Sequence, residues 1–179
     1  MRLLILASAL ALTLVLTGCQ TPHAFSTPDA TWQAHVGQLK FSNRKRTLIG
    51  DVVVQQRGDK DFQLDFIKGG GLPLLSLRQD ASTSRVEGLL AHHSWQGAPE
   101  AAPRPLRPWL KLRQSFAHPP TANRGDQLTM SFLSFPESFA HRPPAKSAHG
   151  EAKFSGGQLT MLFLAFPDDD QRFVFQFNR

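Results

Sequence analysis

Alternation of apolar and polar side chains is the feature of this sequence that most restricts its fold. Near the end of the chain, Phe173, Phe175 and Phe177 alternate with Val174 and Gln176. Successive side chains of an extended segment point to opposite faces, so the three phenylalanine rings share one face. A strand of this kind covers apolar material, which is either the protein's own core or a lipid.

Four earlier segments are also predicted as strands. Residues 47–56 are rich in β-branched side chains, residues 61–67 alternate with period two, and residues 72–77 form a short apolar run. The intervals between them carry glycine, aspartate and lysine, which favour turns, so the three form an antiparallel meander. A fourth strand is expected at 85–90, after a turn at 80–84.

Two short helices are expected. The first spans 29–39, with Asp29 as its N-cap and apolar side chains three and four residues apart. Those side chains are Trp32, His35, Val36 and Leu39. Gly37 weakens this helix by about 1 kcal/mol relative to alanine. The second helix spans 105–116, where a proline suits the first turn, inside a segment at 91–124 whose prolines exclude a central strand over most of its length.

The last third of the chain contains an internal repeat. Residues 127–136 recur at 158–167, a shift of 31 positions, with eight of ten residues identical. Two copies are too few for a solenoid, which needs three or more stacked units. The repeat therefore indicates either two neighbouring strands of one sheet or a duplicated hairpin that presents paired apolar faces to a ligand.

The N-terminus has the layout of a secretory signal. Arg2 precedes an almost unbroken apolar run at 3–16, which is shorter than the roughly 20 residues that a bilayer-spanning helix needs. The only cysteine of the chain, Cys19, follows this run directly.

The four residues 16–19, Leu-Thr-Gly-Cys, resemble a bacterial lipobox. The resemblance implies removal of residues 1–18 and attachment of fatty acyl chains, palmitate among them, to Cys19. The alternative is an ordinary signal peptide with an incidental cysteine. Each buried methylene contributes roughly 0.8 kcal/mol, so several acyl chains would anchor the protein firmly to a membrane. Gln20 stands where an aspartate marks inner-membrane retention in enteric lipoproteins, and the expected location is therefore the periplasmic face of the outer membrane.

The mature chain has the size of one domain. Removing residues 1–18 from the 179-residue chain leaves 161 residues, with 19 basic and 14 acidic side chains. No disulfide can form, so the core depends on apolar burial. The basic residues are dispersed apart from 44–46, and no nucleic-acid partner is expected. The expected organisation is a signal peptide at 1–18, a tether at 19–28 and a β-rich domain at 29–179 with the insertion 91–124.

The residue types that catalysis needs occur without the spacing that it needs. The seven histidines show no spacing that would converge on a metal, and no serine sits in a nucleophile elbow. The glycines at 69–71 precede strand-like sequence, which does not fit a phosphate loop. The sequence predicts neither an enzyme nor a cofactor or metal site.

Several short motifs resemble the LolA/LolB family of lipoprotein carriers and receptors, and most closely its outer-membrane receptors of the LolB type. They are Trp32-x-x-His35, the turn 69–73 followed by Leu75 and Leu77, and Pro105-Leu106-x-x-Trp109-Leu110. The chain departs from those receptors in having no tyrosine. The resemblance implies a mainly β (α+β) fold: an antiparallel curved sheet or half-barrel with one or two short helices.

The resemblance also implies a function in lipid binding and protein transport. Acyl chains of lipoproteins, handed over by a periplasmic carrier, would enter an apolar concavity of the sheet. The expected lining consists of Phe62, Leu64, Phe66, Leu75, Leu77, Phe132, Phe163 and Phe175. Leu72 is expected to touch the membrane. Two alternatives remain: a structural or interaction lipoprotein of the envelope with a filled β core, and a periplasmic module that binds a small apolar ligand.

Overall fold

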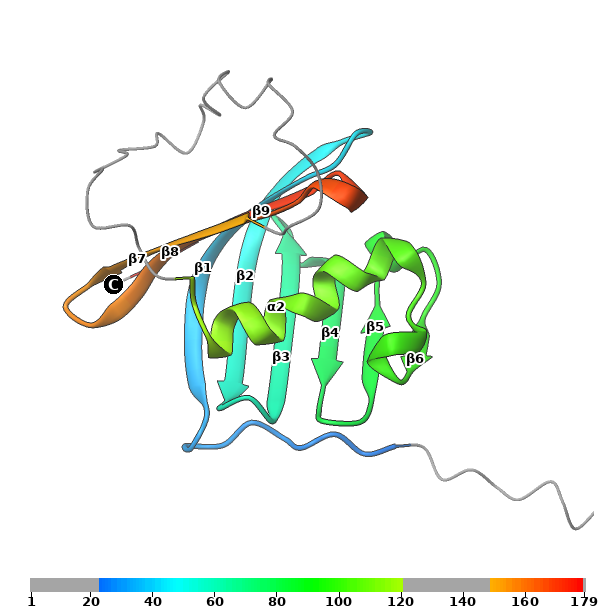
Figure 1. Ribbon diagram of the computed structural model, residues 1–179, viewed down its shortest axis with the longest axis horizontal. Coiled ribbons are helices and arrows are strands. Elements are labelled where there is room, and N and C mark those ends of the chain that lie inside the picture. The colour runs from blue at the N-terminus through cyan, green and yellow to red at the C-terminus, as the bar shows by residue number, and fades with distance from the viewer. Residues whose placement is uncertain (1–22, 121–148, 179) are drawn as a thin grey trace, which may run out of the picture.

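A single antiparallel sheet carries the fold, as a computed structural model of the chain shows (Figure 1). The structure describes residues 23–120 and 149–178. Nine strands lie in the order β6-β5-β4-β3-β2-β1-β9-β8-β7, and every neighbouring pair is antiparallel. Within the described residues the two outer strands, β6 and β7, do not pair, so the sheet is open. The predicted mainly β, antiparallel class is confirmed.

The bounds of the elements are as follows. The strands are β1 (Gln33–Ser42), β2 (Thr47–Arg57), β3 (Asp61–Lys68), β4 (Leu72–Gln79), β5 (Ser84–Glu87), β6 (Trp95–Gly97), β7 (His149–Ser155), β8 (Gln158–Phe166) and β9 (Gln171–Phe177). The described α-helix is α2 (Arg107–Ala117), and the 3₁₀ turns are η1 (Leu89–Ala91), η2 (Pro99–Ala101), η3 (Arg104–Leu106) and η5 (Pro167–Asp169).

The predicted meander is confirmed in β2, β3 and β4. The fourth predicted strand is right only in part, since β5 ends at Glu87 and residues 89–91 form η1. The reason is Gly88, whose φ of 108° turns the chain out of the sheet, a conformation that glycine adopts at little cost.

The predicted helix at 29–39 is wrong, because β1 occupies this region. Asp29 makes a turn instead of a helix cap: its carboxylate accepts the Thr31 N–H at 2.8 Å. From His35 onward every second residue faces the core, where Leu39 and Phe41 are buried. The flanking strands β2 and β9 supply a hydrogen-bond ladder on both sides of β1, which outweighs the local helical spacing.

The junction between β1 and β9 joins the two halves of the sheet. Gly37 is needed here, because a Cβ atom at this position would lie 2.0 Å from the carbonyl oxygen of Gln176. The junction pairs Leu39 with Phe175 and Phe41 with Phe173. The C-terminal strand therefore lies in the middle of the sheet, next to the first strand.

The predicted helix at 105–116 is confirmed as α2. It begins at Arg107, two residues later than expected, since Pro105 lies in η3 and Pro108 occupies the first helical turn. Trp109, Leu112 and Phe116, spaced three and four residues apart, are buried against the sheet.

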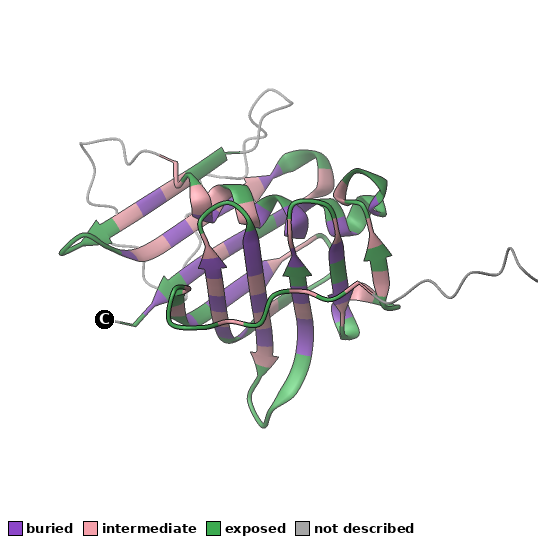
Figure 2. Cartoon of the chain, turned by 90° about the horizontal axis from the view of Figure 1, so that it is seen from below, coloured by how far each residue is buried: buried purple, intermediate pink, exposed green. Residues whose placement is uncertain are grey.

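Burial alternates along the strands, as Figure 2 shows by colour. In β9, Phe173, Phe175 and Phe177 are buried while their neighbours are more exposed, which confirms the predicted shared face. The second copy of the sequence repeat forms β8. The first copy, at 127–136, lies outside the described residues, so the neighbouring-strand interpretation of the repeat stays a prediction.

An extended N-terminal segment, residues 23–32, runs across the strand ends at one end of the sheet, past the β2–β3 and β4–β5 turns (Figure 1). His23 contacts the carboxylate of Asp80 in the β4–β5 turn. Arg57, beside the β2–β3 turn, donates to Ser26 at 3.3 Å and lies 5.8 Å from the Trp32 ring centre. Every described element lies between Gln33 and Phe177, so a chain of residues 20–179 retains all of them. None of the helices described here has the length and apolar character needed to cross a membrane.

Candidate functional site

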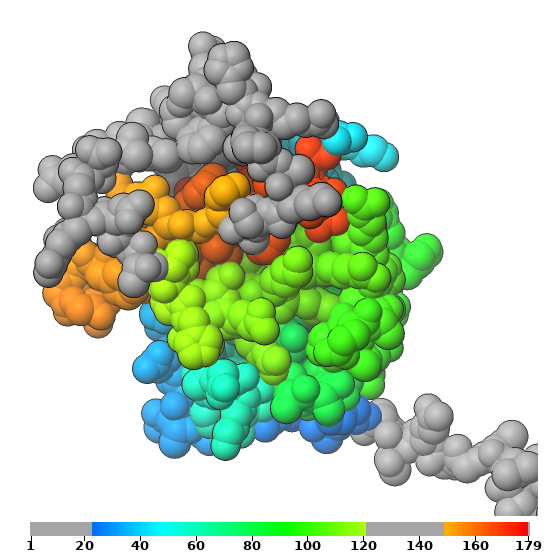
Figure 3. Space-filling view, viewed as in Figure 1, coloured from blue at the N-terminus to red at the C-terminus, as the bar shows by residue number. Residues whose placement is uncertain are grey.

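Helix α2 crosses one face of the sheet. In Figure 1 the strands β2–β5 are seen face-on and β7–β9 nearly edge-on, so the sheet is strongly twisted and curves around the helix. In the space-filling view α2, in yellow-green, occupies the middle of this face (Figure 3). We call the buried surface beneath it the helix-covered face.

Most of the predicted lining residues lie on the helix-covered face. Six of the eight are buried there, with exposed fractions of 1% or less: Phe62, Leu64, Phe66, Leu75, Leu77 and Phe175. Phe163 lies on the opposite face of β8, because Leu162 and Leu164 take the buried side and side chains alternate along a strand. Phe132 lies outside the described residues.

The helix packs directly on these side chains. The Phe116 ring lies 5.7 Å from Phe62 and 5.2 Å from Phe175, measured between ring centroids. The Trp109 ring lies 6.3 Å from Phe66. Because α2 fills the face at these positions, an acyl chain that binds there must displace the helix or slide along its margin.

Hydrogen bonds from side chains to backbone hold α2 at both ends. At the N-terminal end, Gln171 in β9 donates to the Pro105 carbonyl at 2.9 Å, and Arg104 donates to the Asp168 carbonyl at 2.9 Å. At the C-terminal end, Arg113 donates to the Asp80 carbonyl at 2.5 Å. Gln56 in β2 donates to the Phe116 carbonyl at 3.4 Å, a long bond. The helix is therefore attached mainly at its ends and by apolar contact in between.

A row of polar side chains crosses the helix-covered face at its rim. The register places Gln56 opposite Phe62, Phe62 opposite Gln79, and Gln79 opposite Ser84. Three atoms of this row are buried without a hydrogen-bond partner in the described structure: Gln56 Oε1, Gln79 Oε1 and Ser84 Oγ. Sequence reasoning missed this row, although three polar residues at strand ends beside apolar ones gave the signal.

One of these atoms borders a small void. The void measures about 10 Å³ and is lined in part by Gln79 and Trp32, whose indole Nε1–H also lacks a partner among the described residues. A volume of this size is close to the minimum for one water molecule.

Two open hollows lie beside α2, the first at its C-terminal end and the second along most of its length. The first has a volume of about 440 Å³ and is lined by Asp59, Arg113, Gln114, Ser115, Ala117 and His118. The second has about 390 Å³ and is lined by Gln79, Ala81, Pro99, Glu100, Arg107, Leu110, Lys111, Arg113 and Gln114. Both are surface hollows beside the helix, and Gln79 and Leu110 connect the second to the buried seam between α2 and β4.

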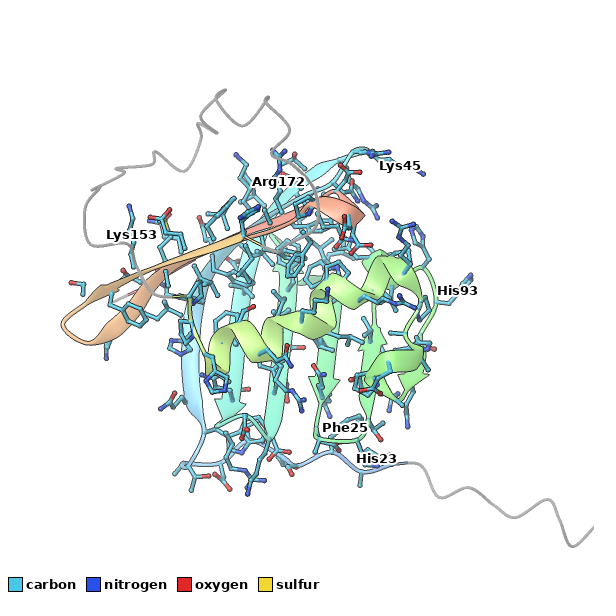
Figure 4. All side chains as sticks on the ribbon, viewed as in Figure 1. His23, Phe25, Lys45, His93, Lys153 and Arg172 are labelled. Carbon is cyan, nitrogen blue, oxygen red and sulfur yellow. The ribbon has the colours of Figure 1, made fainter. Side chains whose placement is uncertain are left out.

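The opposite end of the sheet, away from the N-terminal segment, carries exposed apolar side chains. Leu72, just after the β3–β4 turn, is 48% exposed, and Leu89 in η1 is 56% exposed. Gly70 and Gly71 take positive φ values of 86° and 82°, which shape the turn before Leu72. Figure 4 shows the same two ends of the sheet, with His23 and Phe25 at one end and Lys45 at the other.

Two titratable groups near the helix-covered face have shifted pKa values. Burial lowers the pKa of His35, whose ring lies 5.2 Å from Phe177. Burial raises the pKa of the Asp80 carboxyl, but hydrogen bonds from Ser82, His23 and Thr83 outweigh it, so the pKa is below 3.8. In the part of the chain that the structure describes, no three His, Cys, Asp or Glu side chains are placed to hold a metal ion.

No protein-family model and no curated protein sequence matches this chain.

Proposed function

We propose that this chain is a lipid-anchored protein of the bacterial outer membrane whose domain faces the periplasm and binds acyl chains of lipoproteins or lipids beneath α2. The observation that supports the proposal is the helix-covered face itself. This face is the apolar side of an open, curved sheet. Among the described residues it is covered by one short helix that is attached mainly at its ends. A LolA/LolB-like half-barrel is the finer fold that we propose for it.

The anchor in this proposal is Cys19. The apolar run at 3–16 and the Leu-Thr-Gly-Cys motif support cleavage before the cysteine and acylation of its thiol. Gln20 supports the outer membrane as the location. The partners would be the membrane, through the lipid, and a periplasmic carrier that delivers the client's acyl chains.

Transfer would proceed by exchange of one apolar contact for another. Full burial of a large apolar side chain contributes roughly 1.5–3 kcal/mol, so Trp109, Leu112 and Phe116 together contribute roughly 5–9 kcal/mol. A sixteen-carbon chain, at roughly 0.8 kcal/mol per methylene, gains about 13 kcal/mol on leaving water, roughly 4–8 kcal/mol more than the three side chains contribute. An acyl chain can therefore replace the helix on the sheet.

Leu72 would be the part of the domain that touches the membrane. A leucine that is about half exposed at the tip of a glycine-rich turn can enter the acyl region of a bilayer at little conformational cost.

A second candidate function is a structural lipoprotein of the envelope with a filled core. The close ring contacts between Phe116 and both Phe62 and Phe175 favour it, because they leave the helix-covered face occupied. The two candidates differ in whether α2 gives way to a ligand.

A fluorescent fatty acid added to the purified chain 20–179 tests the proposal. We expect saturable emission growth at a stoichiometry near one, reversed by unlabelled palmitate, whereas a structural protein gives no saturable signal. The absence of binding with a natively folded sample would exclude the acyl-binding function. Depletion of the protein in its native cell, followed by fractionation of lipoproteins, then distinguishes a lipoprotein receptor from a general lipid binder.

A further inference from the structure

The second hollow beside α2 combines positive charge with access to the core. It has a volume of about 390 Å³ and lies between the helix, η2 and the β4–β5 turn. This volume is at the lower end of the range for ligand pockets, so it suits a head group better than a whole lipid. We call it the cationic hollow.

Three basic side chains of the helix line the cationic hollow. They are Arg107, Lys111 and Arg113, against one acidic residue, Glu100. Arg107 and Lys111 are four residues apart and so lie on the same side of the helix. The net charge of the lining is positive, and it favours an anionic ligand.

None of these three cations pairs with a carboxylate among the described residues. Arg107 Nε donates to the Ala102 carbonyl at 3.0 Å, and Arg113 donates to the Asp80 carbonyl. The Lys111 ammonium lies 5.7 Å from the centre of the Phe166 ring. In contrast, Arg104, three residues before Arg107, pairs with Asp169 at 3.3 Å. Three charges without a counterion around one hollow leave capacity for an external anion.

The floor of the cationic hollow leads to the helix-covered face. Leu110 and Gln79, which line the hollow, are 6% and 4% exposed. They mark the seam where α2 lies against β4. An amphiphile with its anion in the hollow would therefore have its acyl chain directed along this seam.

We propose that the cationic hollow binds the phosphate of an amphiphilic phosphate ester, an anionic phospholipid, whose acyl chain enters beneath α2 along Leu110. The inference rests on the proposed acyl-binding function and adds the head-group chemistry to it. Phosphate fits better than a carboxylate because its oxygens are arranged tetrahedrally and can accept from guanidinium and ammonium groups on different sides, whereas the two carboxylate oxygens lie in one plane.

The test compares four probes on the chain 20–179, each below its micelle concentration: lysophosphatidylglycerol, lysophosphatidylcholine, neutral monopalmitoylglycerol and chain-free glycerophosphoglycerol. Titration calorimetry gives each dissociation constant. We expect lysophosphatidylglycerol to bind about tenfold more tightly than lysophosphatidylcholine, and the double variant Arg107→Gln/Lys111→Gln to remove that preference while leaving the affinity for monopalmitoylglycerol unchanged. The double variant Lys45→Gln/Arg46→Gln loses the same charge elsewhere and should keep the preference.

The outcomes separate the two proposals. Equal binding of all three chain-bearing probes, unaffected by Arg107→Gln/Lys111→Gln, would overturn the phosphate site and leave acyl binding intact. Failure of monopalmitoylglycerol to bind would overturn the proposed function. Glycerophosphoglycerol binding as tightly as lysophosphatidylglycerol would assign the hollow to soluble phosphate esters and overturn the phospholipid as its ligand. Near-ultraviolet circular dichroism of every variant verifies that the fold is retained.

Discussion

The indole of Trp109 meets the ring of Phe173 edge to face, with ring centroids 4.8 Å apart and planes at 88°. Phe173 belongs to β9, and its neighbour Phe41 in β1 also lies 5.0 Å from the indole. The helix is therefore packed on the junction at which the two halves of the sheet meet. Helix and sheet stability are coupled at this point.

Trp109→Ala should strongly destabilise the fold. The side chain is 2% exposed, and loss of a large buried aromatic costs about 3–5 kcal/mol. Urea denaturation followed by circular dichroism measures the change, with exposed Ser115→Ala on the same helix as the control. A loss below about 1 kcal/mol would show that α2 contributes little to the stability of the domain.

Gly37→Ala should disrupt the junction of β1 and β9, because the new Cβ would meet the Gln176 carbonyl oxygen. Overpacking of this kind costs about 1–3 kcal/mol or more. Gly69→Ala in the β3–β4 turn is the matched control, since nothing lies within 4 Å of its Cβ position. Thermal unfolding compares the two variants, and equal melting temperatures would contradict the close approach of the backbones.

The half-buried imidazole of His35 should make stability depend on pH. Its folded pKa is lowered by burial below 6.5, so the unfolded state binds the proton more readily. Stability should therefore fall as the pH drops below about 6.5 and level off below the folded pKa. Urea midpoints at pH 7.5 and 5.5 should differ more for the wild type than for His35→Phe, which cannot titrate. The lowered carboxyl pKa values of Asp29 and Asp80 act below pH 3.8 and leave this window unaffected. An equal drop in both proteins would rule out the assignment.

Removal of the His23 side chain should loosen the N-terminal segment. The contact with Asp80 is lost, and an ordinary hydrogen bond is worth about 0.5–1.5 kcal/mol, or roughly a 2- to 10-fold change in opening. Chymotrypsin cleavage after Phe25, followed by mass spectrometry, should accelerate by that factor in His23→Ala. His93→Ala, in the β5–β6 connection, is the control and should cleave at the wild-type rate. Unchanged cleavage in His23→Ala would mean that Arg57 alone holds the segment.

Leu72→Glu should reduce delivery of lipoproteins to membranes while leaving fatty-acid binding intact. A charge at the exposed tip opposes entry into the bilayer, whereas the helix-covered face is unchanged. The control is Phe154→Glu near the β7–β8 turn, where the side chain is 50% exposed. A Leu72→Glu protein that delivers normally to liposomes would remove the proposed role of the tip.

β-Branched content, short apolar runs and period-two alternation together predicted the strands β2–β5 and β9, and the failures elsewhere have physical causes. In β9 the alternation of Phe173 and Phe175 with less apolar neighbours allowed one assignment only. In β1 the apolar residues fit both the period of a helix and that of a strand. Pairing with β9, which is distant in sequence, favours the strand. A single sequence carries no direct signal of such a partner.

The candidate site was less accessible from sequence than the fold. Phe163 was assigned to the wrong face because β8 is apolar on both sides, so alternation gave no direction. The cationic hollow also went unnoticed, although Arg107 and Lys111 stand four apart on a predicted helix. Their significance depends on Leu110 and Gln79, which the fold brings together from distant parts of the chain.

The docked N-terminal segment determines how an anchored domain would stand on its membrane. His23 is four positions after Cys19 in the sequence, a reach of at most about 14 Å. The eight residues of β3 span about 26 Å, so Leu72 lies about that far from the strand ends at which the N-terminal segment is docked. A protein tethered at Cys19 would thus hold Leu72 on the side of the domain that faces away from the membrane. Release of the segment would extend the linker from Cys19 to Gln33 to about 48 Å. This length would allow the whole domain to turn over and bring Leu72 to the lipid.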